Sequence, residues 1–116
     1  MEAPNPLVPI EHAAFSSTKM AKVTLFQSPH VMVGLNCFEP GQAHASHVHA
    51  DMDKVYQVVE GTGLFRLGEQ ESTLSPGAML FAPAGVPHGI RNTGTGRLVV
   101  LAILAPGPKP AGSEHI

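Results

Sequence analysis

A pair of histidines separated by one residue is the feature of this sequence that most directly suggests chemistry. His47-Val48-His49 stands in a stretch, residues 43–49, that we predict to be a β-strand. Residues two apart in a strand point to the same face, so the two imidazoles would lie side by side and can chelate one ion. Imidazole nitrogens bind zinc at about 2.0–2.1 Å. The alternative is that both histidines are exposed on a polar strand face.

A third histidine, His44, stands three residues before His47. Strict alternation in a strand places His44 on the opposite face or in the preceding turn. We therefore expect a supporting or surface role for His44 and do not count it among the ligands.

The residues around the histidine pair form two spaced motifs. The first has the spacing G-x5-H-x-H-x4-K-x6-G and consists of Gly41, His47, His49, Lys54 and Gly61. The second has the spacing G-x5-P-x-G-x2-H-x3-N and consists of Gly77, Pro83, Gly85, His88 and Asn92. Together they resemble the paired motifs of the cupin family, the second at every fixed position and the first at all but one. The resemblance spans about half of the chain.

The resemblance implies a small single-domain cupin of the cupin 2 type. Its fold would be an all-β, double-stranded β-helix, which is a jelly-roll barrel. His88 would arrive from a neighbouring strand as the third imidazole, facing His47 and His49. The implied cofactor is one divalent transition metal ion, Zn, Fe, Mn, Ni or Cu, because imidazole suits several of these ions.

Lys54 is the one departure from the family pattern, which has a glutamate ligand at this position. A protonated lysine has no lone pair and repels a cation, by roughly 3 kcal/mol at about 5 Å and an effective dielectric of about 20. Three outcomes stay open: a three-histidine site completed by water, an Asp51 or Asp53 that replaces the glutamate or neutralises the lysine, and a barrel that has lost its metal. Outside the site, Lys54 would form an ion pair with Asp51 or Asp53 at the barrel mouth.

Four residues on the strand after the histidine pair are candidates for lining the pocket. They are Lys54, Asp53, Tyr56 and Gln57. If Lys54 faces inward, alternation turns Tyr56 inward too and brings its hydroxyl near the metal. Asp53 then points to the other face and needs a bulge to enter, and Gln57 is expected to point outward.

Short apolar or alternating runs separated by turn signals extend over the rest of the chain, which is typical of an all-β domain. The segments expected as strands are 22–27, 31–38, 43–49, 55–60, 64–67, 72–74, 78–81, 89–92 and 98–104. Nine strands in so short a chain fit a jelly-roll barrel, which limits exposed edges. A short helix is conceivable only over 11–15. We expect an extended arm over 1–9, the barrel over 20–104 and a tail over 105–116, all in one domain over 1–116.

Composition excludes several other classes of protein. The chain has 116 residues, which suits one domain, and its 12 glycines and 11 prolines argue against a helical bundle. A net charge of -2 without a basic run argues against nucleic acid as a partner. The longest apolar run has eight residues, Leu98–Ala105, against the roughly 20 of a membrane helix. A single cysteine, Cys37, excludes an internal disulfide. We expect a cytoplasmic protein without a membrane partner.

These observations favour a metal-dependent enzyme that acts on a small organic molecule, of the dioxygenase, isomerase or decarboxylase class. An iron oxygenase with two histidines and one carboxylate is disfavoured, because the carboxylate is missing. One alternative is a non-catalytic cupin module that binds a small ligand or a metal, and another is a barrel whose site is vestigial. The partners expected are a small-molecule ligand and, from the resemblance, a second copy of the chain in a homodimer.

Overall fold

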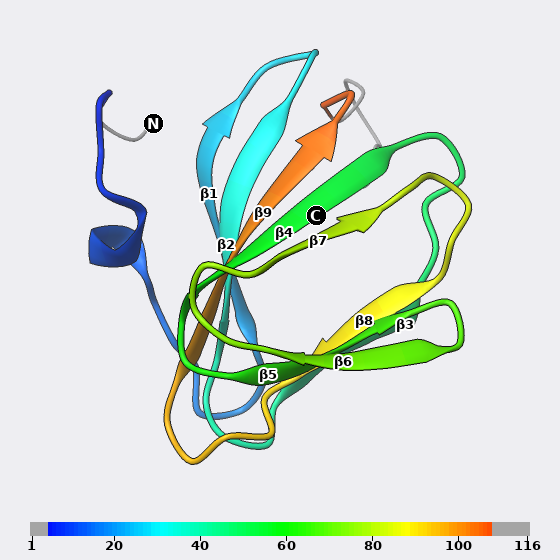
Figure 1. The fold of residues 1–116 in the computed structure, drawn as a ribbon. Coiled ribbons are helices and arrows are strands. Elements are labelled where there is room, and N and C mark those ends of the chain that lie inside the picture. The colour runs from blue at the N-terminus through cyan, green and yellow to red at the C-terminus, as the bar shows by residue number, and fades with distance from the viewer. Residues whose placement is uncertain (1–4, 108–116) are drawn as a thin grey trace.

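Two antiparallel β-sheets make up the part of the chain that the computed structural model describes, residues 5–107. The strands are β1 (Ala21–Gln27), β2 (Met32–Phe38), β3 (Ala43–His47), β4 (Asp53–Glu60), β5 (Gly63–Leu67), β6 (Gln70–Leu74), β7 (Met79–Ala82), β8 (His88–Arg91) and β9 (Leu98–Ala105). The larger sheet has the order β1-β2-β9-β4-β7, and the smaller has the order β3-β8-β5-β6 (Figure 1). The all-β prediction is confirmed.

Nine strands form close to where nine were expected, and each has at least one end that lies one or two residues from its predicted bound. The expected strand over 43–49 ends at His47, so that His49 lies in the segment that leads to β4. In place of a helix over 11–15, a 3-10 helix spans Pro9–His12. No helix in the described residues is long and apolar enough to cross a membrane. The predicted arm and tail fall partly outside the described residues, and the division into arm, barrel and tail stays a prediction.

The inner faces of the two sheets enclose an apolar core. Its largest fully buried apolar side chains are Phe38, Tyr56, Phe65 and Leu98. In β4 the burial alternates residue by residue, with Lys54, Tyr56 and Val58 turned inward. Alternation of this kind follows from the two-residue period of a strand.

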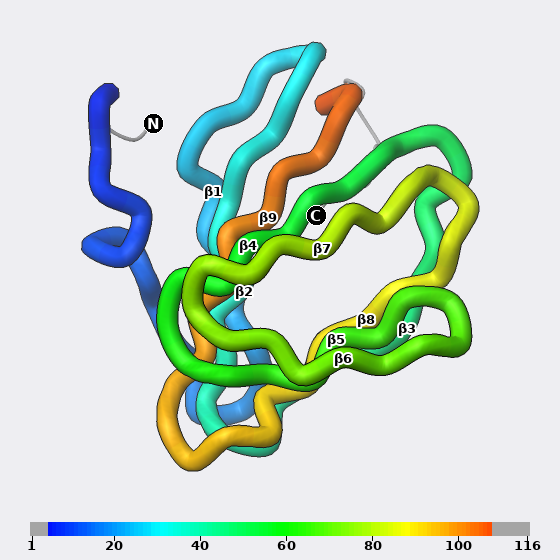
Figure 2. The backbone as a smooth tube through the Cα atoms, in the orientation of Figure 1, coloured from blue at the N-terminus to red at the C-terminus, as the bar shows by residue number. Residues whose placement is uncertain are grey.

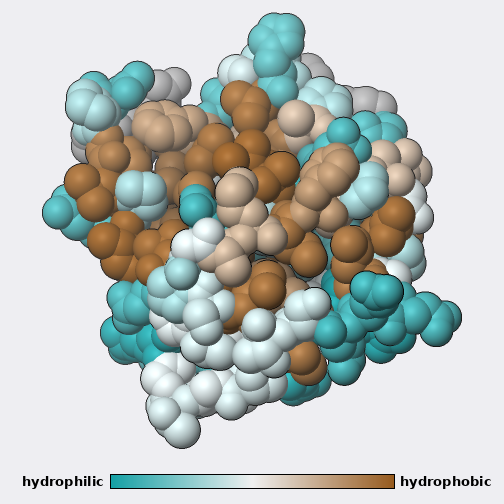
Figure 3. All heavy atoms as spheres, in the orientation of Figure 1, coloured by the Kyte–Doolittle hydropathy of each residue, from teal (hydrophilic) through white to brown (hydrophobic). Residues whose placement is uncertain are grey.

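The larger sheet is apolar on its outer face as well. There Leu35 and Val99 are buried beneath the N-terminal segment, whose Leu7, Ile10 and Phe15 pack against them. The outer face continues beyond this cover to β7, where Met79 is 61% and Phe81 54% exposed. Figure 3 shows hydrophobic side chains gathered on this side, between the N-terminal segment and β7.

Two segments cross from one sheet to the other at the same end of the molecule. Residues 48–52 join β3 to β4, and residues 83–87 join β7 to β8 (Figure 2). The Gly85 amide donates to the carbonyl of His49 at 2.7 Å, which ties the two segments together. Gly85 has φ +85°, a conformation that glycine adopts without strain.

A bulge interrupts β3 between His44 and His47. His44 pairs with Ile90 and His47 with His88, so that three steps along β3 match two along β8. The extra residue presses the backbone of Ser46 against Gly89, where an added Cβ would lie 2.9 Å from the Ser46 nitrogen. A bulge reverses the facing of the residues beyond it, and this one brings His44 and His47 to the same side.

Candidate metal centre

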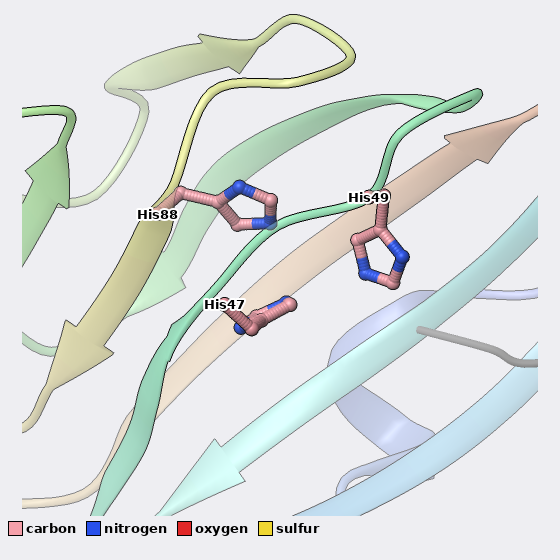
Figure 4. Close-up of side chains that lie close together, drawn as sticks. All are labelled: His47, His49 and His88. Carbon is pink, nitrogen blue, oxygen red and sulfur yellow. The ribbon is translucent and has the colours of Figure 1, made fainter.

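Three imidazoles meet between the two crossing segments. His47 is the last residue of β3, His49 follows two residues later, and His88 is the first residue of β8. Each of the three offers a ring nitrogen, and these nitrogens lie within 4.8 Å of one another. The ring of His47 is centred 5.0 Å from that of His49 and 4.3 Å from that of His88. Figure 4 shows the three side chains approaching one another from these elements.

Backbone carbonyls orient two of the three rings. Nδ1 of His47 donates to the carbonyl of Ala45 at 2.8 Å, and Nδ1 of His88 donates to that of Val86 at 3.0 Å. A hydrogen on Nδ1 leaves the lone pair on Nε2, where it can bind a metal ion. Nε2 of His88 is buried and has no hydrogen-bond partner in the structure. The cluster is therefore consistent with a metal site.

The turn before His88 is held to the start of β4. The Ala84 amide donates to Oδ1 of Asp53 at 2.8 Å, next to the bond between Gly85 and His49. These two bonds fix the segment that presents His88 relative to the one that presents His49. Asp53 thus supports the cluster from outside.

Lys54 faces the imidazoles from the opposite sheet. Its side chain is only 1% exposed, and Nζ lies 3.5 Å from Nε2 of His47. Nζ also lies 5.3 Å from the ring centre of Tyr56, and the Tyr56 ring is centred 6.0 Å from that of His88. The Tyr56 hydroxyl is buried and has no hydrogen-bond partner among the described residues. This side of the site therefore carries hydrogen-bond donors.

Burial shifts the pKa of several groups of the site. Loss of hydration is the main cause that lowers the pKa of His88 to about 4, and His47 and Lys54 lower it further against the hydrogen bond to Val86. Burial lowers the pKa of Lys54 to about 8, with the charge of Lys22 as a second cause. Burial raises the pKa of Tyr56, so its hydroxyl keeps its proton. At neutral pH, His88 is thus in the neutral form that can bind a metal.

His44 is the site neighbour that the alternation argument missed. Its ring is centred 4.4 Å from that of His47, because the β3 bulge turns it to the same side. Burial is the largest cause that lowers its pKa to about 3, followed by the charge of His47. Nδ1 of His44 is buried and finds no hydrogen-bond partner within residues 5–107. The signal in the sequence for this placement was Gly89, because a residue without a side chain leaves room for a bulge in the strand opposite it.

The four pocket candidates divide between the two faces of β4. Lys54 and Tyr56 lie inside. Asp53 is exposed on the outer face, and no bulge brings it in. Gln57 is half-buried on that same outer face, where its amide donates to the Gly77 carbonyl at 3.4 Å. The expected ion pair between Lys54 and Asp53 is not formed, since the two side chains point in opposite directions.

Comparison with known proteins agrees with this architecture. A family model described as a cupin domain matches residues 34–104. The crystal structure of TT1209 from Thermus thermophilus is 43% identical, with a TM-score of 0.82 over 85% of this chain and 94% of that chain. An uncharacterized protein with a double-stranded β-helix domain from Klebsiella pneumoniae is 24% identical, with a TM-score of 0.85 over 96% of both chains.

One curated relative has a name that refers to a ligand. The oxalate-binding protein of Thermotoga maritima is 29% identical over 65 residues, which are 56% of this chain and 54% of that protein. The chain spans 63% and 54% of the lengths of the two curated relatives that it matches.

Proposed function

Since the chain belongs to the cupin family, whose domain model matches residues 34–104, we propose that it binds one divalent transition metal ion through His47, His49 and His88. The observation that carries this proposal is the convergence of three ring nitrogens within 4.8 Å. The donor set suits Zn, Fe, Mn, Ni or Cu, and three protein ligands leave a position open for water or a ligand.

The same site supports a metal-dependent enzyme that acts on a small organic molecule. When bound, the ion would supply Lewis acidity, polarising an oxygen of the ligand. Reactions of the dioxygenase, isomerase or decarboxylase class are compatible with this role. Around the site, the carbonyls of Ala45 and Val86 hold the imidazoles in place, while Lys54 and Tyr56 present hydrogen-bond donors to the ligand.

The second candidate is a non-catalytic module that binds a small ligand or a metal. Lysine at the glutamate position favours it, because one carboxylate that could act as a base is missing. The oxalate-binding relative favours it as well. Consumption of a substrate by the metal-loaded chain, lost in His88→Ala, would separate the enzyme from the binder.

The metal proposal is tested by titrating Zn²⁺ into the chelator-treated chain in a calorimeter. We expect saturable binding that His49→Ala abolishes, because it removes one of three ligands. His30→Ala is the matched control, since His30 is exposed in the turn between β1 and β2. Unchanged stoichiometry in His49→Ala would overturn the ligand assignment.

We also propose that the chain forms a homodimer through the outer face of the larger sheet. Strand pairing places Phe81 beside Val55, Val55 beside Ile103 and Ile103 beside Val33, an apolar row across four strands. Two copies of such a face can bury each other around a two-fold axis. The cytoplasmic location stays a prediction.

Sedimentation of Phe81→Glu tests this interface. We expect a dimer for the unmodified chain and a monomer for the variant, because the interface would bury an unpaired carboxylate. Thr73→Glu, on an exposed position of β6, should remain dimeric. A monomeric unmodified chain would contradict the proposal.

A further inference from the structure

Lys54 is the only lysine, arginine, aspartate or glutamate that is buried among the described residues. The buried polar side chains there are Asn36, Lys54, His88 and Asn92. None of them is a carboxylate. Asp53, the preceding residue along the strand, is directed outward and accepts from the Ala84 amide.

We propose that Lys54 makes this site selective for an anionic ligand, a small carboxylate that lies between the metal ion and the Lys54 ammonium group. The proposal rests on the metal site proposed above, and it adds the chemical class of the ligand. It is carried by the placement of a buried cation beside the imidazole cluster, with no acidic side chain of residues 5–107 buried beside it.

The contact between Lys54 and His47 shows why a ligand is required. Nζ lies 3.5 Å from Nε2 of His47, whose other nitrogen already donates to Ala45. A metal ion at Nε2 takes the lone pair that Nζ would use. The ammonium group then has three donors and no acceptor among its present contacts.

The charges lead to the same conclusion. Three neutral imidazoles bring no negative charge, so a divalent ion and an ammonium group would share one buried region without compensation. Buried charges are strongly disfavoured unless they are paired. A carboxylate has two oxygens, one for the metal and one for the ammonium group, and it removes the repulsion between the two cations. A neutral alcohol or amide would leave that repulsion in place.

Tyr56 provides a second donor on the same face. It stands two residues after Lys54, and its buried hydroxyl has no hydrogen-bond partner in the part of the chain that the structure describes. Burial keeps that hydroxyl protonated by raising its pKa, so it can donate to an anion and cannot add negative charge itself. Lys54 and Tyr56 together form a recognition surface opposite the metal ligands.

The test uses the chain loaded with Co²⁺, whose visible absorption reports on a change of ligand. Cobalt content is first measured by equilibrium dialysis for every variant. Acetate is then titrated as the probe, with acetamide as its neutral counterpart. We expect a saturable spectral change with acetate and none with acetamide.

Lys54→Met is the decisive variant, because it keeps the length of the side chain and removes the charge. We expect it to bind cobalt and to bind acetate at least about tenfold more weakly, which corresponds to about 1.4 kcal/mol. Lys22→Met is the control, since Lys22 is an exposed lysine on β1 whose charge reaches Lys54, and its effect on acetate should stay under about threefold.

The outcomes separate this inference from the metal proposal. Equal acetate affinity in Lys54→Met and the unmodified chain, or equal responses to acetate and acetamide, would overturn the anion-selective role while leaving the metal site intact. Absence of cobalt binding in every variant would overturn the metal site and this inference with it.

Discussion

The two walls of the candidate site differ in what they offer a ligand. β3, β8 and the segment after β3 contribute three imidazoles, whose ring nitrogens can bind a cation. β4 lies opposite and contributes Lys54 and Tyr56, whose polar atoms carry hydrogens. The imidazole wall suits a metal ion, and the β4 wall repels one but attracts an anion.

This difference lies in the side chains that the two walls present to the site. Both walls are built on antiparallel strands, and the alternation of β4 is undisturbed from Asp53 to Val58. A single substitution on either wall should therefore change metal binding without changing the fold. Substitutions on one wall at a time, or on the connection between the two, test this difference.

Removing a ligand from the imidazole wall should have the largest effect. In His47→Ala we expect metal binding to be lost, because two imidazoles are left and Lys54 loses its neighbour. Calorimetric titration with Zn²⁺ measures this, and circular dichroism verifies that the variant is folded. A folded His47→Ala that binds zinc normally would show that the ion sits elsewhere.

Making the β4 wall resemble the other one should have the opposite effect. Lys54→Glu is expected to raise metal affinity tenfold or more, because it removes a repulsion of roughly 3 kcal/mol and adds a ligand. Lys54→Gln removes only the charge, so its metal affinity should lie between those of the unmodified chain and Lys54→Glu. If the affinity of Lys54→Glu is unchanged, the position 54 side chain does not reach the metal.

Acid should weaken the metal-free chain through the imidazole wall. The folded-state pKa values of His88 and His44, about 4 and about 3, lie below the unfolded value of about 6.5. The unfolded chain therefore takes up protons first as the pH falls. The free energy of unfolding should decrease from about pH 6.5 to the region of these lower values.

Urea unfolding of the chelator-treated chain at pH 7, 6 and 5 measures this dependence. The loss of stability should be smaller in His44→Phe, which removes one of the two groups. A free energy of unfolding that stays constant from pH 7 to pH 5 would contradict the assignment of neutral, buried imidazoles.

Loosening the connection between the walls should have the smallest effect. Asp53→Ala removes the acceptor for the Ala84 amide and is expected to lower the free energy of unfolding by about 1 kcal/mol. The measurement is urea unfolding beside Glu69→Ala, an exposed carboxylate in the turn between β5 and β6. Metal affinity should fall only modestly, since Gly85 still donates to His49. A complete loss of metal in Asp53→Ala would make this bond part of the site itself.

Much of this arrangement could be predicted from the sequence. Turn residues and apolar runs located nine strands, and the two-residue period placed Tyr56 on the same face of its strand as Lys54 and Asp53 on the other face. Both depend on local rules that tertiary contacts do not disturb in β4. The motif spacing also identified His88 as a candidate ligand. No pattern within a single strand could have done so.

The remaining features depend on contacts between distant strands. The facing of His44 is set by a bulge that forms against β8, so alternation along β3 alone gave the wrong side. The strand ends at His47 because β8 begins at His88 and offers no partner beyond it. The exposure of Met79 and Phe81 likewise depends on the N-terminal segment covering only part of the outer face.

The most direct test of the metal centre is elemental analysis of the chain purified without chelator or a nickel column, in parallel with His88→Ala and His30→Ala. We predict about one transition metal ion per chain in the unmodified protein and in His30→Ala, and loss of that ion in His88→Ala. Failure of the unmodified chain to retain any metal, even after metals are added back, would contradict the three-histidine site.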